Sequence, residues 1–397
     1  MNGPGDVLPR RDAFRLIAAA AAAPLAIPRQ ATSPVAAQPP APLPLAAGIR
    51  RDDPLLFDVT FEVALSPYIT APVVDPWPVI ASADFILPLV PVLATSEIDR
   101  SSLKAEVLVR GRHDAAAEAG TSLADGRPFG HSWATIPARN FAIDSLRWRV
   151  KWRQRSFTPA VDEAVLRRST WPREWPADAR DFLKPQTAIE SDAPIFADFV
   201  RKTAGERLRQ VSPYLAAKDL VRATCTSFRG VDTSGLVRHS SGAVLGLKLN
   251  GAARAATEGK GSSHDLVAAC VAVLRAAGIP ARPVIAVWKD IDRLAGRPDT
   301  ILVSWGEFLV PGAGWVVFDP LGMRRGPLRS LDVNRPWDGF GAIDDLNEAC
   351  PFCYAFGPEG AIWPYYPAVW GAQPTAGTPA GVPAGFVTVS MSSRGKG

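Results

Sequence analysis

The chain has 397 residues, of which 47% are hydrophobic and 21% charged. This composition excludes a disordered or fibrous protein and leaves room for two or three domains, each with its own core. The net charge of +5 is spread along the chain without a nucleic-acid-binding motif, so we expect no nucleic-acid partner.

The N-terminus predicts an export signal. Arg10 and Arg11 precede an apolar run over residues 16–27. This run is too short to cross a bilayer and fits the hydrophobic region of a signal peptide. The pattern resembles twin-arginine export signals, although Phe14 stands one residue later than usual.

We therefore predict a signal peptide over residues 1–37, cleaved after Ala37, and a proline-rich linker over residues 38–53. The alternative is an Ala-rich helix of the mature protein. No other segment is long and apolar enough to predict a membrane span, so we expect a periplasmic or secreted protein.

Residues 54–160 predict a β-rich domain. Runs such as LLFDVTFEVAL and SLRWRVKWRQRSF alternate apolar and polar residues, and Pro, Gly, Asp and Ser separate them. This alternation is typical of an antiparallel, sandwich-like unit. One strand face carries Leu146, Trp148, Val150 and Trp152, and we expect it to face the core.

Residues 161–345 predict an α+β core. Helical periodicity in APIFADFVRKTAGERL and YLAAKDLVRATCTSF is followed by a short Ala-rich helix and a helix over residues 262–278. The predicted strands ARPVIAVW, ILVSWGEFLV and WVVFD come next, and helices followed by a hairpin sheet indicate the α+β class. Residues 346–397 hold an aromatic segment and a Gly/Pro-rich tail, with one predicted strand in GFVTVSM.

Export would permit disulfides among the four cysteines, for which three complete pairings exist. The CPFC of residues 350–353 has the spacing of a redox motif, but no βαβ pattern surrounds it and no second pair completes a zinc site. We predict a local disulfide or two free thiols there. The cysteines are Cys225, Cys270, Cys350 and Cys353.

The helix predicted over residues 262–278 carries clear end signals. Ser262 or Ser263 can serve as the N-cap, and Asp265 complements the positive end of the helix dipole. Gly278 ends the helix before Pro280. Nearly all of its remaining residues are apolar, so we expect it to be buried on most sides.

This segment resembles the nucleophile helix of the transglutaminase-like superfamily, whose members are related to papain-like cysteine proteases. The likeness lies in LRAAGIPAR, residues 274–282, and in SWGEFLVPGAGWVVFDP, which resembles a second signature with a His two residues before a Trp. It covers roughly residues 55–345. The resemblance implies a central helix packed on an antiparallel sheet, a Cys–His–Asp triad and no organic cofactor.

Two triad positions depart from the family pattern. The nucleophilic Cys falls on Ser263, and the His, counted back from Trp305, falls on Val303; only the Asp is kept, as Asp319. A serine hydroxyl stays protonated near neutral pH and needs a base, which valine cannot be. The resemblance therefore predicts a catalytically inactive copy.

Other groups could supply a base. His264 follows Ser263 directly, but neighbours on a helix point about 100° apart, so we expect it only to line the cleft, with Asp265 and Trp305. His239 could fold back over the site. Cys270 lies about 10 Å further along the helix, which favours a buried small residue over a displaced nucleophile.

Structural roles are the alternative for each of these residues. Ser263 can be an N-cap, Asp265 a dipole partner, Trp305 part of a hairpin core and Asp319 a turn former. The cluster WPYYPAVW, residues 363–370, can pack over a core or form a stacking platform.

The leading hypothesis is an exported, inactive transglutaminase-like protein whose former cleft binds a peptide, a protein or a cell-envelope component. One alternative is an active amidohydrolase, peptidase or acyltransferase with Ser263 as nucleophile and an unusual base. A third hypothesis is an assembly partner that makes contacts through its β-rich domain. Some family members use calcium, but no acidic loop of the EF-hand type occurs, so we expect no cofactor or metal.

Overall fold

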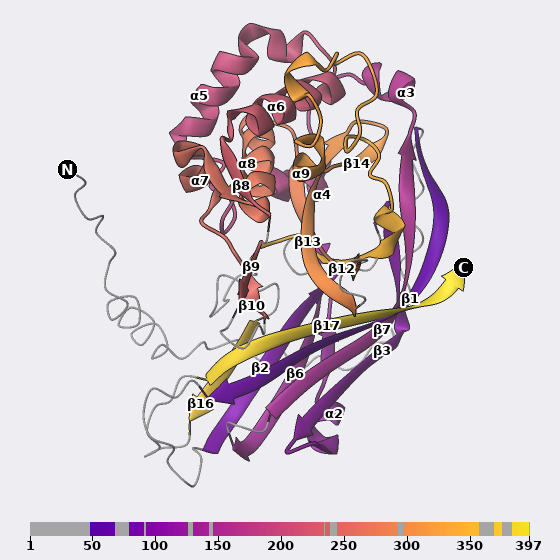
Figure 1. Cartoon of the computed structure of the whole chain (residues 1–397), viewed down its shortest axis with the longest axis vertical. Helices are drawn as coiled ribbons and strands as arrows, with labels where there is room; N and C mark the ends of the chain where they lie inside the picture. The colour runs from indigo at the N-terminus through magenta and orange to yellow at the C-terminus, as the bar shows by residue number, and fades with distance from the viewer. Residues whose placement is uncertain are drawn as a thin grey trace, which may run out of the picture. The chain divides into compact units, whose positions relative to one another are not determined.

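The computed structural model of the chain describes residues 48–67, 79–90, 93–125, 130–142, 146–233, 235–238, 244–292, 297–356, 369–374 and 383–396 (Figure 1). All of these ranges belong to one compact unit, residues 42–397, and the predicted signal peptide lies outside them. None of the described helices is both long and apolar enough to cross a membrane.

Two antiparallel sheets form the β-rich part, which confirms the sandwich-like prediction. The larger has seven strands in the order β4-β3-β7-β1-β17-β10-β9, and the smaller has four in the order β16-β2-β6-β5. The strands of the larger sheet are β1 (Ile49–Pro67), β3 (Ser96–Val109), β4 (Arg112–His113), β7 (Leu146–Val161), β9 (Leu236–Arg238), β10 (Val244–Leu247) and β17 (Pro383–Lys396). Those of the smaller are β2 (Val79–Leu89), β5 (Ser122–Ala124), β6 (Ser132–Ala142) and β16 (Val369–Pro374), and the short helix α2 (Ala115–Ala119) lies beside them.

Strand β7 shows how the sequence pattern builds this core. Its alternate residues Leu146, Trp148, Val150 and Trp152 are at most 2% exposed, which confirms the predicted core face. Trp148 stacks on Phe85 of the smaller sheet, with ring centroids 5.5 Å apart. A period of two thus places one side of β7 in the core.

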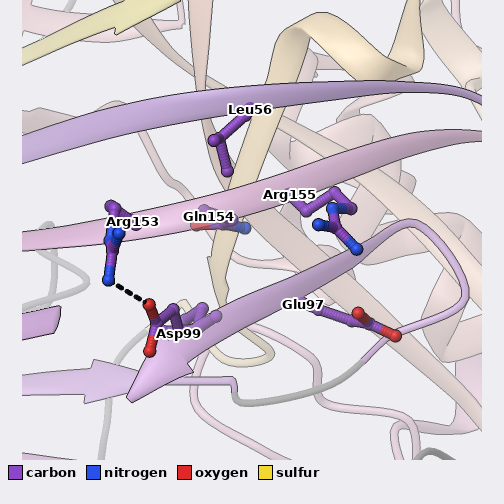
Figure 2. A pocket seen from close by; sticks show the side chains of 7 residues that line it. Leu56, Glu97, Asp99, Arg153, Gln154 and Arg155 are labelled. Carbon is purple, nitrogen blue, oxygen red and sulfur yellow. Dashed lines mark hydrogen bonds and ion pairs between the residues drawn. The ribbon is translucent and has the colours of Figure 1, made fainter. Parts of the chain in front are cut away.

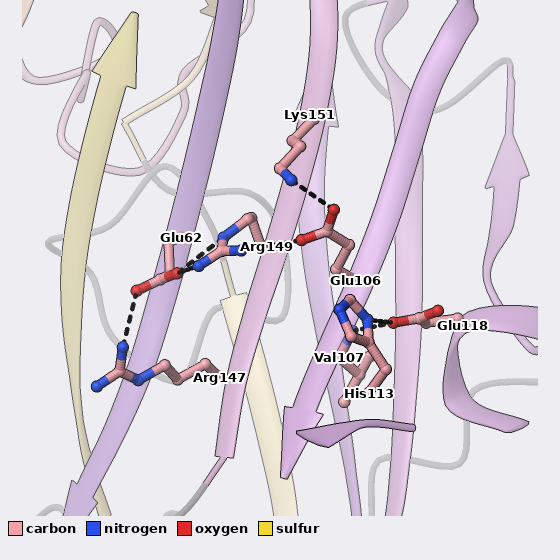
Figure 3. A network of polar contacts seen from close by, with 8 residues as sticks. All are labelled: Glu62, Glu106, Val107, His113, Glu118, Arg147, Arg149 and Lys151. Atoms are coloured by element: carbon pink, nitrogen blue, oxygen red, sulfur yellow. Dashed lines mark hydrogen bonds and ion pairs between the residues drawn. The ribbon is translucent and has the colours of Figure 1, made fainter. Parts of the chain in front are cut away.

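The opposite face of β7 carries charged side chains that pair across strands (Figure 3). Arg149 contacts Glu62 on β1 at 2.6 Å and Glu106 on β3 at 3.0 Å, and Lys151 also pairs with Glu106. Because these pairs are partly exposed, each contributes at most about 1 kcal/mol, and their main effect is to fix the register of the three strands.

The C-terminal strand β17 pairs with β1 along most of its length and with β10 at Val244 and Val387. The strand predicted in GFVTVSM is therefore confirmed and is longer than expected. Since β16 also pairs with β2, strands from the end of the chain complete both sheets that its first strands begin. Figure 1 shows β17 running beside β1.

The remaining described elements form the α/β part, and together they confirm the α+β class. Its sheet has the order β14-β13-β12-β15, and a short parallel pair joins β8 to β11. These strands are β8 (Gly230–Asp232), β11 (Lys260–Ser262), β12 (Ala281–Asp292), β13 (Arg297–Val310), β14 (Gly314–Phe318) and β15 (Ala349–Cys353). The helices are α3 (Glu163–Arg167), α4 (Ala177–Arg180), α5 (Pro194–Thr203), α6 (Pro213–Ser227), α7 (Ala252–Glu258), α8 (Ser263–Ala276) and α9 (Pro320–Met323), with 3-10 turns at Asp181–Leu183, Gly205–Arg209, Leu328–Ser330 and Leu346–Glu348.

Helix α8 is the central element of this part, as predicted. It packs against α5, α6 and α7 and against strands β12 and β13. Every residue from His264 to Arg275 is buried. At the C-terminal end, Gly278 has a φ of +77°, which favours glycine, and the backbone N–H of Ile279 bonds to Leu274.

The two arginines of the LRAAGIPAR motif hold the end of α8 in place. Arg275 donates to the backbone oxygens of Ala281 and Lys184, at 2.8 and 2.6 Å, and burial lowers its pKa to about 9. Arg282 donates through two nitrogens to Glu307 on β13, and its guanidinium carbon lies 3.8 Å from the ring centroids of both Trp315 and Tyr354. These motif residues therefore have structural roles in this fold.

Replacing Arg282 by methionine should lower the free energy of unfolding by about 3–5 kcal/mol, because it leaves the Glu307 carboxylate buried without its ionic partner. The matched control is Arg50→Met, which removes a pair with Asp52 whose side chains are 78% and 44% exposed, and it should cost less than about 1 kcal/mol. Guanidinium denaturation measures both values. Equal losses for the two variants would contradict this role of Arg282.

Candidate active site

The N-terminus of α8 is capped by Ser262 and not by Ser263. Ser262 Oγ accepts the backbone N–H of Asp265 at 3.1 Å, and Asp265 accepts the N–H of Ser262 at 2.9 Å. The two residues thus form a capping box. The interpretation of Ser263 as the cap is therefore wrong, and Ser263 is the first, half-buried residue of the helix.

Asp265 is fully buried, and donors surround its carboxylate. Besides Ser262, the backbone N–H groups of Asn250 and Gly251 donate to Oδ1 at 2.7 and 3.1 Å, and the Asn250 amide donates to Oδ2 at 2.8 Å. These four donors satisfy both oxygens of the buried carboxylate. Asp265 therefore ties residues 250–251 to the start of α8, in addition to its predicted interaction with the helix dipole.

Gly235 lies directly against Ser263 and His264. A Cβ atom at this glycine would come within 2.7 Å of Ser263 Oγ and 2.8 Å of His264 Nε2. Its φ of +57° also favours glycine. The backbone at Gly235 therefore covers one side of the predicted nucleophile, and any larger residue would collide with it. Sequence reasoning missed this contact, because the chain brings the two segments together only in three dimensions.

His264 is a buried, neutral imidazole. Its Nδ1 lies 2.7 Å from Ser304 Oγ, and the backbone carbonyl of Gly235 accepts a hydrogen bond from the ring. Because Nε2 is the ring atom next to Gly235, we assign the proton of the neutral ring to Nε2, which leaves Nδ1 to accept from the Ser304 hydroxyl. Burial lowers the pKa of His264 to about 4. Both ring nitrogens thus have hydrogen-bond partners other than Ser263.

The position expected for the catalytic histidine holds an apolar side chain in an apolar environment. Val303 is half-buried and packs, with the buried Trp305, against a cluster that includes Val284 and Val317. Because side chains alternate along β13, the intervening Ser304 points to α8, where it meets His264. Ser304 is a contact that sequence reasoning missed; its signal was a polar residue between two apolar ones.

Asp319 lies at the end of β14 and caps the short helix α9. Its Oδ1 accepts the backbone N–H of Leu321 at 3.0 Å, which agrees with the turn-forming role. Burial raises the pKa of this carboxyl. Within the described residues, no imidazole bonds to it, so the structure does not bring Asp319 together with a base.

The remaining predicted candidates do not join the site. Cys270 is fully buried, which confirms its interpretation as a small core residue, and all four cysteines are free thiols. His239 lies outside the described residues, as do residues 363–368 of the aromatic cluster. No group of three or more His, Cys, Asp or Glu side chains in the described part of the chain could hold a metal ion.

A cavity of about 360 Å³ lies elsewhere, on the larger β-sheet (Figure 2). Arg153 and Asp99, which line it, pair with each other at 2.6 Å, and Glu97 pairs with Arg51. Glu97, Asp99 and Arg153 are thus paired within the protein, and the fourth charged side chain of the lining is Arg155. The residues that carry the chemistry of interest are those around Ser263.

Comparisons with known proteins relate one part of the chain to a family. The family model of the transglutaminase-like superfamily matches residues 237–320, which include Ser263, Val303 and Asp319. Among the solved structures, a proposed cysteine protease from Cytophaga hutchinsonii has 15% identity and a TM-score of 0.49, covering 88% of this chain and 94% of that one. The periplasmic domain of TgpA from Pseudomonas aeruginosa has 15% identity and a TM-score of 0.32, covering 71% and 96%.

No curated protein matches the chain. The match to the family model spans both sequence signatures and the elements from β9 to the start of α9. Residues 237–320 of this chain form a transglutaminase-like core.

Proposed function

We propose that this chain is an exported, non-catalytic transglutaminase-like protein that binds a peptide, a protein or a cell-envelope component at the N-terminus of α8. One observation carries the proposal: Ser263, at the nucleophile position, has no group beside it that could take its proton. Val303 is apolar, and the only described imidazole nearby, that of His264, has both nitrogens bound elsewhere.

This arrangement should lower the rate of acyl transfer by a large factor. Loss of a positioned general base lowers a rate by about 10²–10⁴, and members of a triad act as a unit. The loss of the base affects a serine nucleophile more than a cysteine nucleophile, because the serine hydroxyl hardly ionises near neutral pH. The site therefore lacks the means for acyl transfer by the family mechanism.

Binding is supported by what the site retains. Ser263 is half-buried and, among the described residues, its hydroxyl has no hydrogen-bond partner. It stands at the positive end of a 14-residue helix, where N–H dipoles favour carbonyl or carboxylate groups. A peptide offers both groups. Export is proposed on the N-terminal pattern with Arg10 and Arg11.

The rival function is an active hydrolase or transferase with Ser263 as nucleophile. Its best argument is that Ser263 Oγ and His264 Nε2 both lie against Gly235, so the two atoms are close. However, the N–H assigned to Nε2 donates a hydrogen bond to the Gly235 carbonyl, and a nitrogen that carries its hydrogen cannot act as a base. The geometry therefore favours the non-catalytic function.

Incubation of the folded chain with a fluorophosphonate should give no adduct on Ser263, read by mass spectrometry of its peptides, because nothing activates the hydroxyl. Hydrolysis or transfer of glutamine-peptide amides should stay at background and should not change in Ser263→Ala. The double variant Ser263→Cys with Val303→His, which restores a thiol and an imidazole, serves as the control for the assay. An adduct on Ser263, or activity that Ser263→Ala abolishes, would overturn the proposal.

The single variant Ser263→Cys should place one reactive thiol at the proposed binding site, since the four native cysteines are buried. Its alkylation by iodoacetamide should slow about tenfold when a tryptic digest of cell-envelope proteins supplies a ligand at ten times its Kd. The control is Arg201→Cys on α5, where the native side chain is 71% exposed. The same change in rate at both positions, or none at position 263, would argue against binding there.

A further inference from the structure

Two cysteines that are distant in sequence meet between α6 and α8. Cys225 lies near the end of α6 and Cys270 in the middle of α8, and both are fully buried in the same apolar core. Helix α6 packs against α8, and burial, followed by the neighbouring Cys225 thiol, raises the pKa of the Cys270 thiol. Cys225 Sγ also contacts the backbone oxygen of Pro320 at 3.7 Å, next to Asp319.

The pair that the sequence suggested, Cys350 and Cys353, has the opposite geometry. Both lie on the extended strand β15, where residues three apart point to opposite faces and their Cα atoms are about 10 Å apart. A disulfide requires Cα atoms closer than about 7 Å. Each sulfur also has its own contact, Cys350 with Ser156 Oγ at 3.8 Å and Cys353 with the Ala355 oxygen at 3.1 Å.

We propose that Cys225 and Cys270 form an intramolecular disulfide that joins α6 to α8 when the chain folds under oxidising conditions. The two helices that carry these cysteines pack against each other in the folded chain. The bond would constrain the unfolded chain over the loop from residue 225 to residue 270 and hold these two helices of the α/β part together. This inference does not depend on the proposed function.

The reaction requires a disulfide-containing oxidant, such as oxidised glutathione or an oxidoreductase in its disulfide form. One cysteine thiolate attacks the oxidant, forms a mixed disulfide and releases one thiol; the second thiolate then displaces the other. Two electrons and, in balance, the two thiol protons pass to the oxidant, which leaves as two thiols. Burial raises the pKa of the Cys270 thiol well above its usual value, so the exchange takes place before the two helices close.

The test folds the full chain in the presence of oxidised glutathione, unfolds it in acid, alkylates free thiols with N-ethylmaleimide and maps the peptides by mass spectrometry. Two of the four cysteines, Cys350 and Cys353, should carry adducts, and a cross-linked peptide should contain Cys225 and Cys270. Reduction before alkylation should give four adducts. Four adducts without reduction, or a cross-link that includes Cys350 or Cys353, would overturn the proposal.

Two variants make the assignment specific. Cys270→Ser should abolish the cross-link and leave three free thiols, because Cys225 then has no neighbouring sulfur. The matched control Cys350→Ser should keep the cross-link and leave one free thiol. A cross-link that persists in Cys270→Ser, or one that is lost in Cys350→Ser, would contradict the pairing.

Discussion

The burial of helix α8 is the constraint on which the rest of this fold depends. A helix surrounded by helices and strands must satisfy its end groups within the protein, because water does not reach them. At one end, the capping box of Ser262 and Asp265 draws in residues 250–251, and at the other Gly278 and Arg275 turn the chain into β12. The same polar contacts that end the helix therefore position the strands beside it.

This constraint gives structural roles to residues of both sequence signatures. The arginines of LRAAGIPAR bind backbone oxygens and Glu307, and Asp319 caps α9, so these residues contribute to the fold whether or not a triad is present. Ser263, at the nucleophile position, makes no such polar contact, and Val303, at the histidine position, packs with Trp305 against an apolar cluster. His264 is held by Ser304 and Gly235 as part of the packing.

Much of the fold could be predicted from local patterns. The alternation of apolar and polar residues predicted the buried face of β7, and the capping and end signals located α8 to within a residue or two. The candidate site was harder to predict than the fold, because its geometry depends on contacts between distant segments. The cover that Gly235 forms over Ser263, the Ser304 contact on His264 and the meeting of Cys225 with Cys270 all arise from tertiary packing, and no spacing in the sequence encodes them. The sequence did not decide between Ser262 and Ser263 as the N-cap, because the two serines are adjacent.

The central claim is that no base stands beside Ser263, and the state of His264 tests it most directly. Nitrogen-15 NMR of the histidine rings in the folded chain, with the signal of His264 assigned by its loss in His264→Gln, reports both the tautomer and the pKa. Because burial disfavours the charged imidazole, its pKa falls to about 4, and the ring should stay neutral, with the proton on Nε2, as the pH drops from 8 to 5. A His264 that titrates near pH 6.5 or above, or that carries its proton on Nδ1 with Nε2 free, would contradict the account.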